Sequence, residues 1–129
     1  MQAPGITRTL GKKKTMIKNL TQHAPTESQV QAGVTGVDEH ALKYLNFSTP
    51  PSVEEIETRA YAIACRAAGY DDAMIGGAPY LMPALVAALH QAGVQPLFSF
   101  TERKSEEQTL PDGTVRKVSV FAHVAWIAV

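Results

Sequence analysis

The sequence predicts an α/β fold: a small Rossmann-like, three-layer sheet of mostly parallel strands that ends in an antiparallel β-hairpin. Two observations support this prediction. Short apolar segments alternate with amphipathic helical segments over residues 16–101, which is typical of strand–helix–strand units. Beyond residue 101 the helical periodicity disappears, and a Pro-Asp-Gly turn separates two extended segments. At 129 residues the chain fits one domain, which we expect over residues 16–129.

The first half of the chain predicts one strand and a series of short helices. Residues 16–20 form the expected first strand. Thr26 and Gln29 make a capping box at the start of a short helix. Residues 34–37 predict a short second strand, and Asp38 then caps a further helical turn.

The middle of the chain contains the strongest helical pattern and the stretch that organises the fold. A helix with an apolar stripe starts at Ser52 and runs to Gly69. The apolar residues 73–75 lack alternation, as expected for a central strand that is buried on both faces. The Gly76-Gly77 turn follows at once, and we expect the next helix to begin directly after it.

The last third predicts a strand over 95–101 and then a long hairpin around the turn at 111–113. Its tip is expected to project beyond the sheet. His123 lies in an apolar stretch of the return strand, so we expect a structural role for it.

Composition excludes several classes of protein. Hydrophobic residues make up 45% and charged residues 19% of the chain, which argues against global disorder. The single cysteine cannot form an intrachain disulfide. No apolar run reaches the roughly 18 residues of a membrane span, and no signal peptide is recognisable. A cytoplasmic protein without a membrane partner is expected.

The charges are unevenly distributed. Residues 1–15 hold four basic residues and no acid, and they lack apolar periodicity, so we expect a disordered tail there. Of 12 basic and 12 acidic residues, the rest of the chain keeps 8 basic against 12 acidic, a net charge of −4. Because non-specific binding to nucleic acids needs a basic face, we do not expect it here.

Ligands in open α/β sheets bind beyond the carboxyl ends of the strands. If the first and central strands are neighbours, the residues that follow each of them converge on one cleft. The glycine turn lets a ligand approach the backbone, and a helix N-terminus favours a phosphate or carboxylate. The expected ligand-binding residues are Thr21, Gln22, Gly76, Gly77, Ala78, Tyr80, Ser99 and Arg103, with His23 as the candidate catalytic residue.

These residues do not name a reaction. The glycine pair lacks the spacing of a dinucleotide fingerprint or a P-loop, so a plain strand-to-helix turn explains it equally well. His23 is either a general base or an exposed histidine without a role. Tyr80 either stacks on a base or covers the helix start. Arg103 either grips an anion or forms cross-strand ion pairs. No Cys/His cluster is present, so neither a metal site nor a cofactor is expected.

Three segments carry a family resemblance: residues 19–26 (Asn-Leu-Thr-Gln-His-Ala-Pro-Thr), 75–81 (Ile-Gly-Gly-Ala-Pro-Tyr-Leu) and 110–123, from Leu-Pro-Asp-Gly to Phe-Ala-His. Over residues 16–129 the chain resembles a family of small uncharacterised proteins found in bacteria and phages. Its plan also resembles small CRISPR-associated Rossmann-fold (CARF-type) accessory proteins, some of which bind or cleave cyclic oligonucleotide signals. That resemblance implies a homodimer with the site across the two-fold axis. It also implies that the nucleotide is faced by Thr21, Gln22, His23, Gly76 and Gly77.

Two functions of different classes remain open. The first is binding, with or without cleavage, of a nucleotide-type or other anionic ligand at the strand ends. The second is a non-enzymatic protein–protein interaction module, in which the apolar C-terminal strand pairs with a copy of itself or with a partner. A hydrolase of small molecules has weaker support, because Ser99 and Ser105 lack a nucleophile elbow. Whether the protein is an enzyme is left open by the sequence.

Overall fold

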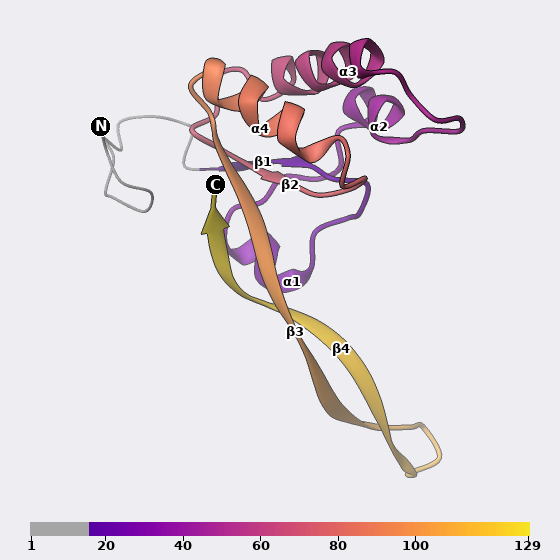
Figure 1. The fold of residues 1–129 in the computed structure, drawn as a ribbon. Coiled ribbons are helices and arrows are strands. Elements are labelled where there is room, and N and C mark those ends of the chain that lie inside the picture. Colours follow the sequence, from indigo (N-terminus) through magenta and orange to yellow (C-terminus); the bar gives the residue numbers. More distant parts are fainter. Residues whose placement is uncertain (1–15) are drawn as a thin grey trace.

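The computed structural model describes residues 16–129, and the tail predicted for residues 1–15 lies outside the described residues. The elements are β1 (Ile17–Leu20), α1 (Glu27–Gln31), α2 (Glu39–Leu45), α3 (Val53–Cys65), β2 (Asp72–Ile75), α4 (Met82–Gln91), β3 (Gln95–Thr109) and β4 (Val115–Ala128). Figure 1 shows a helical body from which β3 and β4 extend as a long ribbon. Within residues 16–129, no helix is long and apolar enough to cross a membrane.

The strands form one open sheet in the order β1-β2-β3-β4. β1 pairs with β2, and β2 with β3, in parallel, whereas β3 and β4 are antiparallel. The mostly parallel sheet with an antiparallel C-terminal pair is therefore confirmed. Leu20 lies beside Ile75 at the carboxyl ends of β1 and β2, so the neighbouring strands on which the expected cleft depends are present. The predicted strand over 34–37 is wrong, because only a single bridge joins Val34 to Ile17.

The helices are divided unequally between the two faces of the sheet. α2, α3 and α4 cover one face, and α1 lies on the other side, beside β4 (Figure 1). The main core lies under the three helices and contains leucines and alanines from every element there. A smaller cluster on the opposite face joins Ile17, Val34, Met74 and Leu97 to Trp126. The three-layer arrangement stays a prediction, because α1 spans only five residues.

Two of the predicted helix starts are confirmed by their hydrogen bonds. The Gln29 N–H donates to Thr26 Oγ1 at 3.2 Å, and the Thr26 N–H donates to Gln29 Oε1 at 2.9 Å, which closes the capping box. Ser52 Oγ accepts from the Glu55 N–H at 3.1 Å. The Glu55 carboxylate pairs with Arg59 at 2.7 Å instead of returning to the cap.

The start of α4 differs from the prediction. The helix begins at Met82, five residues after Gly77, and Pro83 stands in its first turn. Residues 78–81 form a separate turn, in which the Leu81 N–H donates to the Ala78 carbonyl at 3.0 Å. The expectation that a helix N-terminus directly follows the glycine pair is wrong. Backbone groups of the turn itself, rather than a helix dipole, therefore face the strand ends.

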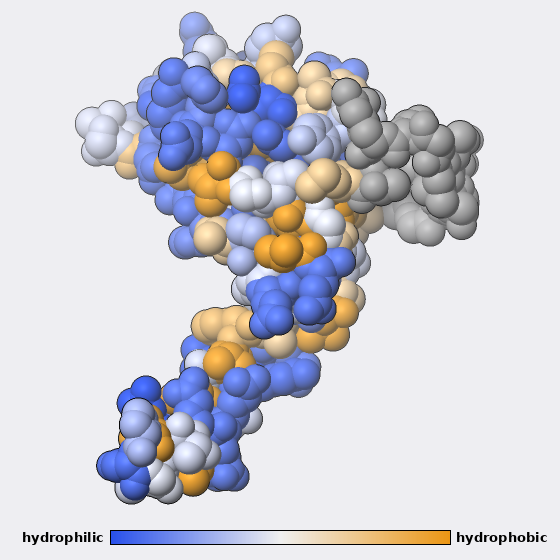
Figure 2. Space-filling view, turned by 180° about the vertical axis from the view of Figure 1, so that it is seen from behind, coloured by the Kyte–Doolittle hydropathy of each residue, from blue (hydrophilic) through white to orange (hydrophobic). Residues whose placement is uncertain are grey.

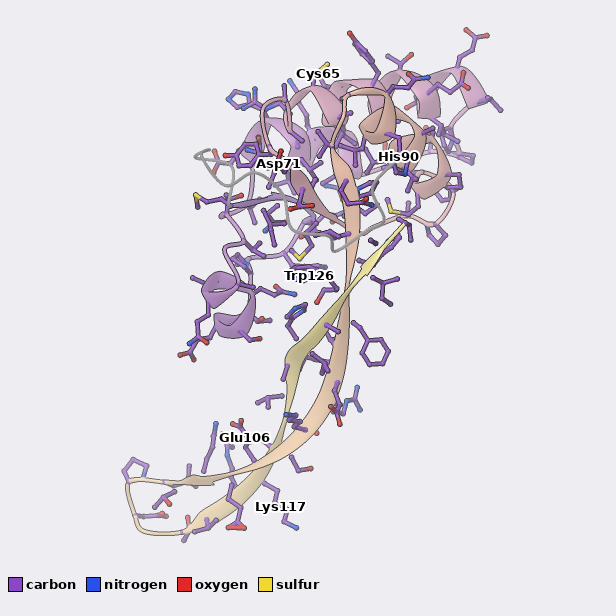
Figure 3. The ribbon with its side chains drawn as sticks, turned by 90° about the vertical axis from the view of Figure 1, so that its left-hand side faces the viewer. Cys65, Asp71, His90, Glu106, Lys117 and Trp126 are labelled. Atoms are coloured by element: carbon purple, nitrogen blue, oxygen red, sulfur yellow. The ribbon has the colours of Figure 1, made fainter. Side chains whose placement is uncertain are left out.

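β3 and β4 confirm the predicted hairpin that projects beyond the sheet. Glu106 and Lys117 lie far along this ribbon, away from the helices (Figure 3). The pairing shifts by one residue between Phe100, which pairs with Ala125, and Thr101, which pairs with His123. Val124 is the extra residue of this bulge. Because successive strand residues alternate between faces, the bulge moves His123 onto the same face as Trp126.

Candidate functional site

A cavity of about 580 Å³ opens at the carboxyl edge of β1, β2 and β3. Its volume lies in the range of roughly 300–1,000 Å³ that is usual for small-molecule sites. All the predicted site residues except Tyr80 and Arg103 line it, which places Thr21, Gln22, His23, Gly76, Gly77, Ala78 and Ser99 around one space. Thr101, which the sequence places with Ser99 on the same predicted strand at this cleft, also lines the cavity. The sequence did not indicate Gln29, Phe98 and Phe121, which line it as well.

The two remaining predicted residues lie beside the cavity. Tyr80 is half exposed, and its ring packs edge-on against Phe47 with the ring centroids 5.2 Å apart. This contact fits the interpretation that Tyr80 covers neighbouring structure. The Arg103 guanidinium lies 5.1 Å from the ring centroid of Phe121, which does line the cavity. Arg103 is thus separated from the cavity by one aromatic side chain.

The loop after β1 is held by Asn19, a residue that was not among the predicted site residues. Its side chain is completely buried. Asn19 Oδ1 accepts from the Thr21 N–H at 2.9 Å and from Thr21 Oγ1 at 2.7 Å, and Asn19 Nδ2 donates to the His23 carbonyl at 3.1 Å. A buried polar residue in a strand must find such partners, because an unsatisfied polar group is costly. Asn19 thereby bends residues 21–23 over the end of the strand.

The same loop is also tied to the helical layer. Gln22 Nε2 donates to the Leu45 carbonyl at the end of α2, at 3.2 Å. The His23 side chain is exposed at the cavity, while its backbone takes part in the loop hydrogen bonds. Hydrogen bonds between side chains and backbone groups therefore position the polar residues that follow β1. The imidazole of His23 is exposed at the cavity.

The two glycines of the turn have different structural requirements. Gly77 has a φ of +138°, a conformation that side-chain-bearing residues rarely adopt. A Cβ at Gly76 would meet Thr21 Cγ2 at 3.6 Å, an ordinary contact. Gly77 is thus needed for the path of the chain, whereas Gly76 leaves space beside Thr21 inside the cavity.

A hydrogen-bonded set of three polar residues lies at the β3 side of the cavity. Gln29 Nε2 donates to Ser99 Oγ at 3.1 Å, and Ser99 Oγ lies 2.6 Å from His123 Nδ1. The imidazole packs on Trp126 with the ring centroids 4.2 Å apart, at the junction of ribbon and body (Figure 3). The backbone N–H of His123 donates to Ser28 Oγ, in the turn that opens α1, at 3.1 Å. These contacts hold the ring in one place.

Burial lowers the pKa of His123 below its ordinary value, because the charged imidazolium loses hydration there. The neutral ring is therefore the form present near pH 7. Such a ring has one nitrogen that accepts a proton and one that donates. The sequence predicted only a structural role for His123 and did not indicate its hydrogen bond with Ser99.

Within residues 16–129, no group of three or more His, Cys, Asp or Glu side chains is arranged to hold a metal ion. The chemistry that these side chains offer is hydrogen bonding, proton transfer and aromatic stacking. Among residues 16–129, the lining of the cavity includes no Lys or Arg. The Arg103 guanidinium lies over the ring of Phe121, which does line the cavity.

The fold and the cavity define a small α/β protein with an open sheet and a candidate ligand site at its carboxyl edge. The chain belongs to the uncharacterized protein MJ1673 family, whose model matches residues 14–127. This match confirms the predicted membership of a family of small uncharacterised proteins. No curated protein and no solved structure matches the chain. The comparisons give no support to a CARF-type relationship or to a phage source, and both stay predictions.

Proposed function

We propose that this protein binds a nucleotide-type or other anionic ligand in the cavity at the carboxyl edge of the sheet. The observation that carries the proposal is the meeting of the loops that follow β1 and β2 with residues 98–101 of β3, around one space of about 580 Å³. This is the place where ligands bind in Rossmann-like sheets, so the three-layer plan predicted from the sequence belongs to the same proposal.

The two sides of the cavity suit the two parts of a nucleotide. On one side, Gly76 and Gly77 leave backbone groups accessible, as in loops that bind phosphate. On the other side, Phe121 offers aromatic surface on which a base can stack. The Arg103 guanidinium, 5.1 Å from the centroid of the Phe121 ring, adds positive charge near this surface.

A thermal-shift screen with nucleoside mono-, di- and triphosphates, cyclic nucleotides, cyclic oligonucleotides and inorganic phosphate tests this function. At a ligand concentration of 100 times Kd, binding stabilises the folded state by about 2.7 kcal/mol. For a domain of this size we expect a rise in Tm of about 10 °C. No rise with any of these compounds would show that the cavity does not bind this class of ligand.

Phe121 and Phe100 provide a matched pair of variants. Both rings are more than half exposed, at 60% and 53%, but only Phe121 is among the residues that line the cavity. Stacking of one base contributes about 1–3 kcal/mol, so Phe121→Ala should weaken nucleotide binding by about 5- to 150-fold. Phe100→Ala should leave the affinity unchanged. Titration calorimetry measures both affinities. Equal affinities for the two variants would show that Phe121 does not contribute to nucleotide binding.

The ribbon favours a second function, association with another copy of this chain. A two-stranded ribbon is at best marginally stable alone in water, and residues 101–109 are exposed along its whole length. Val118, Val120 and Ala122 alternate on β4 and therefore share one face. Figure 2 shows apolar surface where the ribbon leaves the body and in patches along it. Residues 101–122 carry four acidic and four basic side chains, so two ribbons approach each other without net repulsion.

Light scattering coupled to size-exclusion chromatography tests this association. We expect the protein to elute as a dimer, and Val120→Glu, which places a charge in the row formed by Val118, Val120 and Ala122, to give a monomer. Ser119→Glu adds the same charge on the opposite face of β4 and should leave the dimer intact. A protein that is monomeric at every concentration tested would contradict the second function and leave ligand binding untouched.

A further inference from the structure

The bulge in β4 creates a contact that regular alternation would not allow. If β4 paired regularly, without a bulge at Val124, His123 would lie on the face of the sheet opposite to Ser99. With it, His123 reaches the face that carries Ser99, and the Ser99 Oγ to His123 Nδ1 distance is 2.6 Å. β-Bulges are frequently found next to active sites, where they redirect a side chain. Here the redirected side chain is an imidazole beside a hydroxyl that lines the cavity.

The hydrogen bonds fix the orientation of the groups around Ser99. The N–H of Thr26 donates to Gln29 Oε1, so the capping box fixes which end of the Gln29 amide faces Ser99. Gln29 Nε2 then donates to Ser99 Oγ. In the imidazole tautomer that carries its proton on Nε2, His123 Nδ1 accepts the Ser99 proton. The Ser99 oxygen then keeps a second lone pair for the cavity.

We propose that Ser99 and His123 act as nucleophile and general base toward a carboxylic ester or thioester bound in the cavity. The inference rests on the proposed function, because the same cavity must hold the ligand. The chemistry follows from the lining: near Ser99 the side chains are neutral, with Gln29 and Thr101 beside it, and the described lining residues include no Lys or Arg. An uncharged acyl carbon can react at such a place without a cation, while the anionic part of the ligand lies at the glycine turn, as proposed above.

The reaction consists of two proton-coupled steps. Ser99 Oγ forms a bond to the carbonyl carbon while its proton passes to His123 Nδ1, and the bond from carbon to the leaving alcohol or thiol breaks as His123 returns that proton to it. Water then attacks the acyl-Ser99 ester and gives a proton to His123. The carboxylic acid leaves as Ser99 regains its proton. One ester and one water are converted into one acid and one alcohol.

A fluorophosphonate–biotin probe tests the nucleophile without knowledge of the natural ligand. An activated serine displaces fluoride from this probe, so a phosphonyl adduct forms on the serine oxygen. In the full-length protein we expect one adduct per chain, located at Ser99 by peptide mass spectrometry. Ser99→Ala should abolish it. Ser105→Ala, which removes an exposed ribbon hydroxyl, should leave it unchanged.

The base is tested with His123→Gln, which should slow labelling by about 100-fold or more, in the range expected for loss of a general base. His90→Gln removes an exposed histidine of α4 that does not line the cavity, so this variant keeps the dyad and should label at the normal rate. Absence of an adduct at Ser99 in the folded wild-type protein overturns the inference, as does equal labelling of wild type and His123→Gln. Labelling at Ser99 in a protein that no nucleotide stabilises would support the dyad and count against the nucleotide proposal, so the two failures are distinguishable.

Discussion

Replacing Asp38 by alanine is expected to lower the free energy of unfolding by about 3–5 kcal/mol, the usual cost of removing one partner from a buried ion pair. The Asp38 side chain is only 3% exposed. Its Oδ2 lies 2.8 Å from Lys18 Nζ of β1 and 3.1 Å from Arg66 Nε at the end of α3, and its Oδ1 accepts from two N–H groups of α2. One carboxylate thus joins three elements of the body.

Asp38→Asn separates the two roles of this side chain. The amide oxygen can still cap α2, a role worth about 1 kcal/mol, whereas the charge opposite Lys18 is lost. Asp38→Asn should therefore be more stable than Asp38→Ala by about 1 kcal/mol but less stable than the wild type. Urea unfolding followed by circular dichroism measures all three. Equal stability of wild type and Asp38→Ala would show that the network contributes nothing.

The same residue predicts a dependence of stability on pH. Burial acts to raise the pKa of Asp38, but hydrogen bonds from Lys18, the Ala41 N–H and Arg66 outweigh it, and the pKa lies well below its ordinary value. A depressed carboxyl pKa stabilises the fold above the unfolded-state value of about 3.9. That contribution is lost as the pH falls from there through the folded-state pKa. Asp38→Asn should show a smaller loss of stability over this acidic range.

Replacing Asn19 by alanine is the second change with a large expected effect. It removes three hydrogen bonds from Asn19 and leaves the half-buried N–H of Thr21 without this partner, while the His23 carbonyl keeps a hydrogen bond from Thr21 Oγ1. Each lost hydrogen bond contributes about 0.5–1.5 kcal/mol, so we expect a loss of about 2–4 kcal/mol in the free energy of unfolding. Because residues 21–23 line the cavity, nucleotide affinity should also fall by about tenfold or more.

Thr21→Val is the matched control for Asn19. It removes the hydroxyl, which donates to Asn19 Oδ1 at 2.7 Å and accepts from the His23 N–H at 3.3 Å, and it keeps the hydrogen bonds from Asn19 to the Thr21 N–H and the His23 carbonyl. The expected cost is about 1 kcal/mol, with a smaller change in affinity. Chemical unfolding and calorimetric titration of both variants measure these effects. An Asn19→Ala protein that binds nucleotide as tightly as the wild type would show that this loop does not form the site.

Much of the fold was predictable because it depends on residues that are close together in the sequence. The capping box at Thr26, the cap at Ser52 and the turn at 111–113 each rest on residues close together in sequence. The cavity was predictable for the same reason. Polar and glycine residues follow β1 and β2 directly, and parallel neighbours bring such ends together.

The features that escaped prediction depend on long-range register. No local signal shows that Val124 is a bulge, and regular alternation along β4 would assign His123 to the wrong face. The sequence predicts Gln29 only as a capping residue. Its second partner, Ser99, is 70 residues away along the chain. Asn19 was predicted only as part of a strand, because its partners depend on how the loop folds back. A buried polar residue at a strand end is the signal that points to it.

The most direct test of the ligand site is a two-dimensional ¹H–¹⁵N NMR titration with the nucleotide that raises Tm most. If the cavity is the site, amide shifts will be largest for residues 21–23, Gly76, Gly77 and Thr101, with smaller changes along the distal ribbon. A second hollow of about 530 Å³ on α2 and α3, next to Lys43 and Arg59, offers the nucleotide two cations. Shifts confined to that hollow, with residues 21–23 and the glycine turn unmoved, would contradict the account.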